Sequence, residues 1–218
     1  MDYCTPSLFI YSILPISFVV SIPFSFLASK HADIVNNSWG LQLINNVMVN
    51  HGLIIFSSLY FTYLYDNGRI NYRNYWLRYF FIIVFSIILF IWWFGSSILE
   101  RINIFTGGHC YDPLLITIGQ CHQYDSNWIN GFDISGHFYI LSIYFTIIMN
   151  ETYKKFKSID FDINSLSSND KILLSISLIT LILWYFEFLI TAIFFHSIGE
   201  KLIGMMLGYI IPLLYIDL

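Results

Sequence analysis

The chain has 218 residues, of which 57% are hydrophobic and only 11% are charged. An average soluble domain has about 25% charged side chains, so this much apolar surface cannot be hidden in one water-soluble core. A soluble enzyme is therefore excluded. The net charge of −4 also gives no electrostatic support for a nucleic-acid partner.

Three long charge-free stretches predict that the chain crosses a membrane several times. No Asp, Glu, Lys or Arg occurs from Tyr3 to Ser29, from Ile34 to Tyr65, or from Tyr79 to Leu99. Each stretch exceeds the ~20 residues with which a helix crosses ~30 Å of hydrocarbon. We expect an all-α, polytopic membrane bundle with six transmembrane helices, formed as a single domain over residues 1–218. In chain order, the expected spans are about 8–28, 41–65, 77–99, 135–149, 172–195 and 202–216.

The positions of Lys and Arg predict the orientation. If the N-terminus is cytosolic, the loops after the second and fourth spans are cytosolic too, and together with Arg78 at the margin of the third span they hold seven of the ten basic residues. Cytosolic loops carry the excess of positive charge, so both termini are expected in the cytosol. The loop Glu100–Gly131 then faces the opposite side. The seven residues are Arg69, Arg73, Arg78, Lys154, Lys155, Lys157 and Lys171.

Two of the three cysteines, Cys110 and Cys121, lie in this loop. In an oxidising lumen they would pair as a disulfide that closes a short loop. The alternative is a metal site, since His109 precedes Cys110 and His122 follows Cys121. The spacing fits no standard zinc ribbon, so the sequence favours the disulfide and leaves the metal site open.

His137 lies at the expected start of the fourth span. Asp133 or Ser135 can serve as the N-cap, which leaves backbone N–H groups near Gly136 for an anion. An imidazole at this position would supply a proton or a positive charge to a phosphate oxygen. The alternative is a capped helix whose histidine simply faces the membrane interface.

His196 ends the expected fifth span and is therefore predicted at the same membrane face as His137. On a continuing helix, Glu200 at i+4 would accept one ring N–H of His196 and fix its tautomer. Alternatively, Gly199 marks the turn into the sixth span and Glu200 reaches back across it. Both side chains could also simply be wetted at the membrane boundary.

Glu187 is the only acidic residue deep inside an expected span, where a charge is costly and a partner or a function is expected. It lies nine residues before His196, about half a turn out of phase on an ideal helix. The phase predicts that Glu187 points away from the histidine pair. His51, inside the second span, is expected to be structural, and Gly204 and Gly208 are spaced for close helix packing.

The order and content of these motifs resemble the fat storage-inducing transmembrane (FIT) family. The likeness rests on Gly131–His137 (GFDISGH) and His196–Lys201 (HSIGEK) followed by Gly204, with support from Trp92–Phe94 and Cys121–Gln123. It covers roughly residues 80–210 and is that of a short, fungal-like member.

The resemblance implies a multi-pass protein of the endoplasmic reticulum membrane with its active site facing the lumen. The family implies hydrolysis of fatty acyl-CoA to acyl-4'-phosphopantetheine and adenosine 3',5'-bisphosphate. It also implies support of lipid droplet formation, phospholipid metabolism and membrane homeostasis, with diacylglycerol or triacylglycerol as bound lipids. The alternative is a non-catalytic protein that binds and partitions these neutral lipids.

The resemblance also implies roles for individual residues. His137 and His196 match the family's catalytic histidines. A distant similarity to the lipid phosphatase/phosphotransferase superfamily implies that His196 attacks phosphorus, with Glu200 in the place of the usual Asp. His137 would protonate the leaving group or stabilise the transition state. No metal or other cofactor is required. Because the chain lacks the superfamily's Arg-Pro pair, Arg101 and Lys201 are the phosphate-binding candidates, chosen by position.

Overall fold

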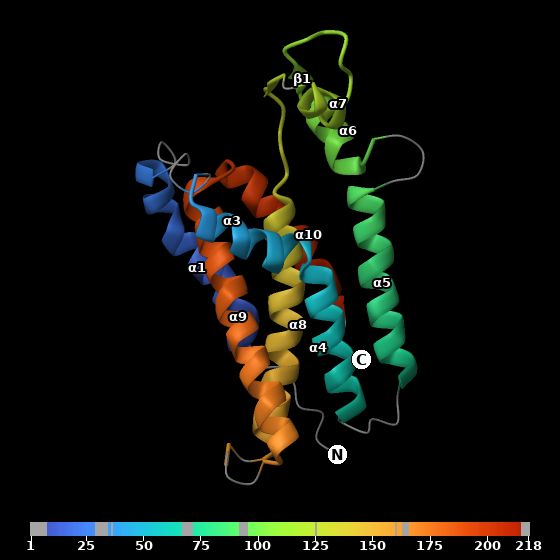
Figure 1. The fold of residues 1–218 in the computed structure, drawn as a ribbon, viewed down its shortest axis with the longest axis vertical. Helices are drawn as coiled ribbons and strands as arrows, with labels where there is room; N and C mark the ends of the chain where they lie inside the picture. The colour runs from blue at the N-terminus through green and yellow to red at the C-terminus, as the bar shows by residue number, and fades with distance from the viewer. Residues whose placement is uncertain are drawn as a thin grey trace.

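The protein is an all-helical bundle with one small strand pair (Figure 1). The computed structural model describes residues 8–28, 35, 37–66, 72–91, 96–124, 126–159, 161–162 and 166–214. The elements are α1 (Leu8–Ala28), α3 (Trp39–Asn45), the π-helical η2 (Asn46–Asn50), α4 (Gly52–Asp66), α5 (Tyr72–Phe90), α6 (Ile98–Phe105), β1 (His109–Cys110), α7 (Ile118–Gln123), β2 (Trp128–Ile129), α8 (Gly136–Ser158), α9 (Ser168–Phe194) and α10 (Ile198–Leu214).

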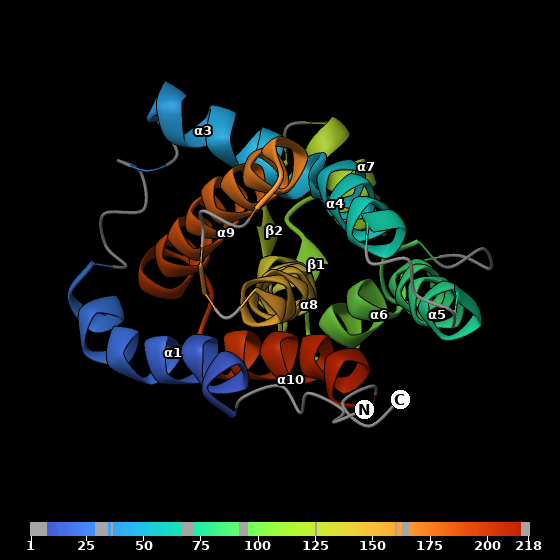
Figure 2. The ribbon, with the colours of Figure 1, turned by 90° about the horizontal axis from the view of Figure 1, so that it is seen from below.

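Helix α8 is the centre of the bundle. A view along the bundle shows it enclosed by α1, α4, α9 and α10 (Figure 2), and most of its side chains from Phe138 to Thr152 are buried. Aromatic rings fill its contacts. Phe138 packs on Phe188 of α9 with ring centroids 4.4 Å apart, and Tyr144 stacks on Phe56 of α4 at 4.5 Å. Such pairs add about 0.5–1.5 kcal/mol each beyond their area burial.

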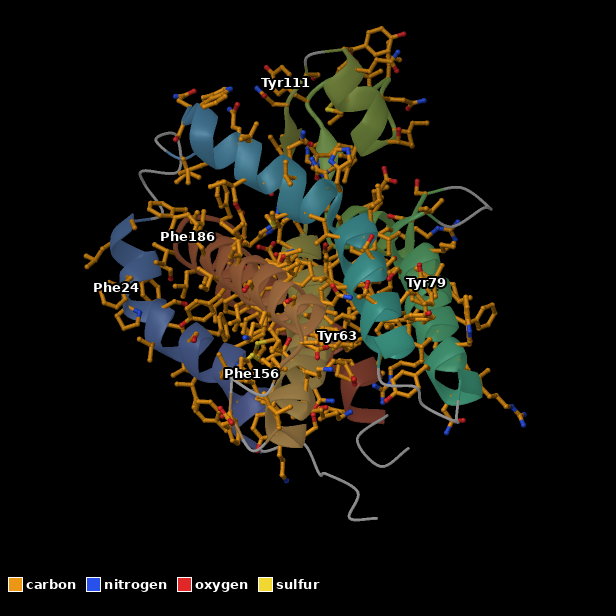
Figure 3. The ribbon with its side chains drawn as sticks, turned by 60° about the horizontal axis from the view of Figure 1, so that its bottom comes forward. Phe24, Tyr63, Tyr79, Tyr111, Phe156 and Phe186 are labelled. Carbon is orange, nitrogen blue, oxygen red and sulfur yellow. A yellow bond between two sulfur atoms is a disulfide. The ribbon has the colours of Figure 1, made fainter. Side chains whose placement is uncertain are left out.

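The outer helices carry the surface that a membrane would cover. Among the described residues, three helical segments are long and apolar enough to span: Phe9–Ala28, Arg73–Phe90 and Ser168–Phe194. The bent pair Trp39–Asn50 and Gly52–Tyr65 makes four if it counts as one span. Side chains such as Phe24 and Phe186 point outward from these helices (Figure 3). The helix α8 does not reach this threshold because many of its side chains are polar, and α10 does not because it has only 17 residues.

Two expected spans differ in detail. The second is divided, since η2 interrupts the helix and the two halves meet at 53° next to His51. The His51 ring donates from Nδ1 to the carbonyl oxygen of Asn46 at 2.9 Å, so it serves its own helix end. The third helix ends at Phe90 instead of continuing to Leu99, and Trp92–Phe94 lie outside the described residues.

A small cap stands above the end of α5 (Figure 1). Ser97 begins α6 by accepting the N–H of Glu100 through its side chain, as N-cap serines do. Strands β1 and β2 pair in antiparallel register, with Cys110 opposite Trp128. The indole Nε1 of Trp128 donates to the side-chain oxygen of buried Asn103 at 2.8 Å, which fixes the strand pair on α6.

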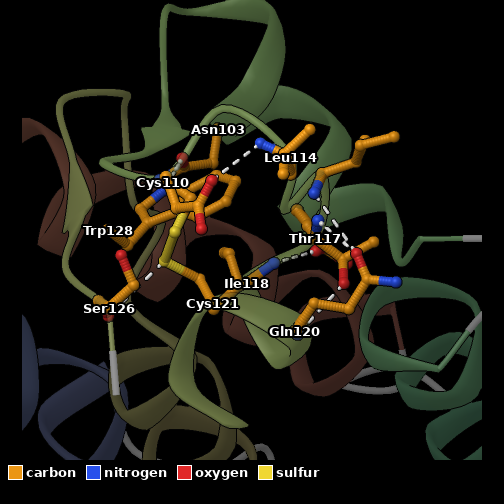
Figure 4. Close-up of a disulfide and its surroundings, with 12 residues drawn as sticks. Asn103, Cys110, Leu114, Thr117, Ile118, Gln120, Cys121, Ser126 and Trp128 are labelled. Atoms are coloured by element: carbon orange, nitrogen blue, oxygen red, sulfur yellow. Dashed lines mark hydrogen bonds between the residues drawn. A yellow bond between two sulfur atoms is a disulfide. The ribbon is translucent and has the colours of Figure 1, made fainter. Parts of the chain in front are cut away.

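The cap is closed by a disulfide between Cys110 and Cys121 (Figure 4). The two sulfur atoms are bonded to each other, so neither is a thiolate ligand for a metal. Of the two arrangements that the sequence left open, the structure contains the disulfide.

Two glycines allow α10 to lie directly against α8. A Cβ atom at Gly204 would collide with the carbonyl oxygen of Ser135, and one at Gly208 with that of Tyr139. Small residues four apart permit such close backbone approach in membrane helices. The contact fixes the start of α10 beside the start of α8.

We predict that Gly208→Ala lowers the thermal unfolding temperature in detergent. The added methyl would meet the Tyr139 carbonyl oxygen and Ser142 Cβ, and overpacking of this kind costs typically 1–3 kcal/mol. Gly40→Ala in α3 is the matched control, because nothing lies within 4 Å of a Cβ there. Equal unfolding temperatures for the two variants would contradict the packing role of Gly208.

Candidate active site

The backbone changes direction where α9 ends, and this turn places His196. Helix α9 stops at Phe194, Phe195 is extended, and His196 has a positive φ of 57°. A left-handed conformation costs a residue with a side chain roughly 1–2 kcal/mol. Such conformations persist where the surrounding structure enforces them, and they cluster at functional sites.

The start of α10 provides part of that enforcement through a capping box. Ser197 Oγ accepts the backbone N–H of Glu200 at 3.4 Å, and Glu200 Oε2 accepts the backbone N–H of Ser197 at 2.6 Å. The pattern Ser-x-x-Glu therefore begins a new helix directly after His196, so the helix of α9 does not continue to Glu200.

The same carboxylate holds the segment before α8. Glu200 Oε1 accepts the backbone N–H of Asp133 at 2.7 Å, and the carbonyl oxygen of Glu200 accepts the N–H of Ser135 at 3.3 Å. Ser135 then caps α8 by accepting the N–H of Phe138 through Oγ at 3.4 Å. Glu200 thus connects the segment that carries His196 to the segment that leads to His137 through hydrogen bonds.

Hydrogen bonds shape the pKa of Glu200. Burial by itself would raise the pKa of this carboxyl group. The N–H groups of Ser197 and Asp133, the Ser197 hydroxyl and nearby His196 stabilise the ionised form and hold the pKa below its ordinary value. Glu200 is therefore a fixed negative charge at neutral pH.

The Nδ1 edge of the His196 ring faces two carboxylates. Its Nδ1 is 3.6 Å from Asp133 Oδ2 and 3.9 Å from Glu200 Oε2. These distances are those of ion pairs and exceed those of hydrogen bonds. Negative charge at this edge favours a proton on Nδ1 and leaves Nε2 with its lone pair.

The His137 ring is held from another helix. Its Nε2 donates to Asn45 Oδ1 of α3 at 2.8 Å. Helix α3 crosses the same end of the bundle (Figure 1), so the second expected span also contributes to the site.

Both rings line one cavity of about 280 Å³ between α3, α8 and α9. Its wall has a polar part, formed by both histidines, Asn45 and Glu187, and an apolar part. The full lining is Val35, Leu41, Gln42, Asn45, His137, Glu187, Ile190, Thr191, Phe195 and His196. A polar end joined to apolar walls suits a ligand that has a charged group and a hydrocarbon chain.

The two cations chosen as phosphate-binding candidates lie elsewhere. Lys201 is 2% exposed, and its ammonium donates to the carbonyl oxygen of Ala192 near the end of α9 at 2.7 Å. Arg101 donates from Nε to the carbonyl oxygen of Ser96 on the cap side of the molecule. Neither residue lines the cavity.

The lining includes residues that the sequence analysis did not place in the site, and Glu187 and Asn45 are the most informative of them. Glu187 shares the cavity with both histidines, so the prediction that it points away is wrong. The phase argument assumed a continuous helix to His196, whereas the helix ends at Phe194. Asn45 could have been predicted as a site residue, because a polar residue inside an expected span indicates a partner or a function.

The remaining predicted site residues do not line the cavity but hold the segments that carry the two histidines. Asp133 and Ser135 hold the turn before α8, and Gly136 is the first residue of that helix. Within the described part of the chain, no three His, Cys, Asp or Glu side chains gather as a candidate metal site.

The fold and the cavity define a class: an all-α membrane protein in which a histidine at the start of one helix and a histidine in the turn between two others share one pocket. The family model "Fat storage-inducing transmembrane protein" matches residues 42–176 and 160–215, which is most of the chain. The protein belongs to this family.

Curated relatives carry an enzyme name. Acyl-coenzyme A diphosphatase FITM2 of Homo sapiens is 29% identical over 131 residues, which cover 54% of this chain and 47% of that protein. FITM2 of Xenopus laevis is 33% identical over 124 residues, covering 54% and 46%. Acyl-coenzyme A diphosphatase fit1 of Schizosaccharomyces pombe is 25% identical over 178 residues, covering 77% and 67%.

The matched region spans about half the length of the vertebrate relatives. No solved structure matches the chain.

We predict that Glu200→Gln destabilises the protein at neutral pH. A carboxamide offers one acceptor oxygen, so one of the N–H groups of Ser197 and Asp133 loses its partner, at a cost of about 1–3 kcal/mol. Because the folded-state pKa of Glu200 is depressed, its stabilisation is present above the ordinary carboxyl pKa and is lost as the pH falls through the folded value.

The measurement is the unfolding free energy of wild type and variant in detergent between pH 7 and pH 3. The difference should be largest at pH 7 and shrink on acidification. A difference that does not depend on pH would contradict the assigned role of the ionised carboxylate.

Proposed function

We propose that this protein is an acyl-CoA diphosphatase that hydrolyses fatty acyl-CoA to acyl-4'-phosphopantetheine and adenosine 3',5'-bisphosphate. The observation that carries the proposal is the shared cavity of His137 and His196. The names of the relatives supply the substrate, and the apolar wall of the cavity suits an acyl chain.

The geometry supports a two-step phosphoryl transfer. In the first step, Nε2 of His196 forms a bond to one phosphorus of the diphosphate, and the bridging P–O bond breaks. His137 donates a proton to the departing phosphate oxygen. In the second step, water attacks the phosphohistidine, the P–N bond breaks, and His137 takes the proton from water.

Nearby carboxylates support this assignment of roles. Asp133 and Glu200 face Nδ1 of His196 at 3.6 and 3.9 Å, so they stabilise the positive ring that forms when Nε2 becomes bonded to phosphorus. The start of α8 lies beside His137, and the partial positive charge of a helix N-terminus favours a phosphate group. The scheme uses no metal or other cofactor.

We place the site on the lumenal side of the endoplasmic reticulum membrane. Helix α3 and the start of α8, which contribute lining residues to the cavity, lie at the same end of the bundle as the cap with its disulfide (Figure 1), and disulfides persist in oxidising compartments. The basic residues Lys154, Lys155 and Lys157 end α8 at the opposite side of the bundle, where the excess of positive charge marks the cytosol.

The same proposal includes a single domain over residues 1–218 with six transmembrane helices and both termini in the cytosol. In this arrangement α8 crosses the membrane enclosed by the other helices, and α10 crosses it with one apolar face exposed, at Met206 and Leu213 among others. Support of lipid droplet formation and phospholipid metabolism, and contact with diacylglycerol or triacylglycerol, belong to the proposal as well.

The test measures the release of adenosine 3',5'-bisphosphate from oleoyl-CoA by purified protein in detergent. His137→Ala and His196→Ala should each lower the rate by about 10²-fold or more, as expected for loss of an acid–base group or a nucleophile. His109→Ala is the matched control, because this exposed ring lies on the cap, where it donates to the nearby Gly107 carbonyl oxygen, and the variant should leave the rate unchanged.

Thermal unfolding curves establish that each protein is folded. Unchanged rates in both active-site variants, when all proteins are folded, would reject the proposed activity. A wild-type protein that binds diacylglycerol but releases no product would instead favour the lipid-partitioning alternative.

A further inference from the structure

Glu187 is a buried acidic side chain whose position the two-histidine mechanism does not explain. It is 3% exposed and lines the same cavity as both histidines. Among the residues that the structure describes, no side chain or backbone group forms a hydrogen bond with its Oε1 atom. A buried polar atom without a partner is costly, so a ligand that supplies a donor to this atom would remove the cost.

The partner of Glu187 within the cavity is not one of the histidines. No ion pair or hydrogen bond joins the Glu187 carboxyl group to His137 or His196 in the described part of the structure. An ionised carboxylate repels phosphate oxygens and accepts hydrogen bonds. A neutral hydrogen-bond donor is therefore the ligand group that suits ionised Glu187.

The position of Glu187 along α9 indicates which part of a ligand would contact its carboxyl group. Glu187 lies seven residues before the end of the helix at Phe194, which is about 10 Å along the helix axis at 1.5 Å per residue. Ile190 and Thr191 line the cavity between Glu187 and the histidine end. A diphosphate held at the histidines would thus direct the next part of its substituent along α9 toward Glu187.

We propose that Glu187 recognises the pantetheine arm of the substrate by accepting a hydrogen bond from its hydroxyl group or from an amide N–H. This inference rests on the proposed acyl-CoA diphosphatase activity. The arm begins directly at the diphosphate, and its hydroxyl and first amide lie only a few bonds beyond the phosphorus. Glu187 is then the residue that distinguishes an acyl-CoA from a diphosphate ester of a plain hydrocarbon chain.

The test compares two substrates that share the adenosine 3'-phosphate 5'-diphosphate group. One is oleoyl-CoA, and the other carries a plain alkyl chain in place of the pantetheine arm and acyl group. Kinetics are measured for wild type, Glu187→Gln and Glu187→Leu. Phe186→Leu is the matched control, because the neighbouring Phe186 side chain is exposed on the outer face of α9 (Figure 3).

For Glu187→Leu we expect KM for oleoyl-CoA to rise about tenfold, the size of one lost hydrogen bond to a buried acceptor. Its kcat should change little, and KM for the alkyl substrate should stay the same or fall. Glu187→Gln retains one acceptor oxygen, so the rise should be smaller. Phe186→Leu should match wild type with both substrates.

Three results would overturn the inference. If Glu187→Leu shifts KM equally for both substrates, or for neither, Glu187 does not recognise the arm, while the proposed activity stands. If wild type releases no adenosine 3',5'-bisphosphate from oleoyl-CoA, the proposed activity and the inference both fall. If Glu187→Leu does not fold, the nearly isosteric Glu187→Gln decides, and an unchanged preference for oleoyl-CoA would count against the inference.

Discussion

The carboxylate of Glu200 is the constraint on which the candidate site depends. Its two oxygens accept the backbone N–H groups of Ser197 and Asp133, residues that are far apart in the chain. The first bond starts α10 directly after His196, and the second holds the turn that leads to His137. Close packing of α10 on α8 at Gly204 and Gly208 keeps the two helix starts together. These hydrogen bonds and this helix packing therefore hold the two imidazole rings at one cavity.

Much of this arrangement could be predicted from the sequence. The motifs around His137 and His196 placed both residues at helix ends on one face, and Ser135 was a candidate N-cap, which it is. The sequence could not decide whether the helix continued through His196 or broke there. That choice depends on a positive φ at a histidine, which tertiary contacts enforce against local preference. The phase error for Glu187 follows from the same unseen break.

Hydropathy predicted the outer helices better than the inner ones. The helices α1 and α9 face outward and are apolar enough to be recognised, whereas α8 is enclosed by protein and tolerates polar side chains. The structure has a bend beside His51 and a helix end at Phe90. Both breaks fall inside continuous apolar stretches, so hydropathy alone does not predict them. Charge placement was misleading for Lys201, because a cation near a predicted site can serve a buried carbonyl group instead. Long side chains such as lysine can reach in several directions, so sequence position fixes them poorly.

The most direct test of the account is a cryo-electron microscopy structure of the wild-type protein with orthovanadate, which mimics the phosphoryl-transfer transition state. The account predicts vanadate in the cavity, bonded to Nε2 of His196, with the His137 ring about 3 Å from a vanadate oxygen. Vanadate that contacts only one of the two rings, or that binds outside this cavity, would contradict the claim that both histidines act on a single phosphorus.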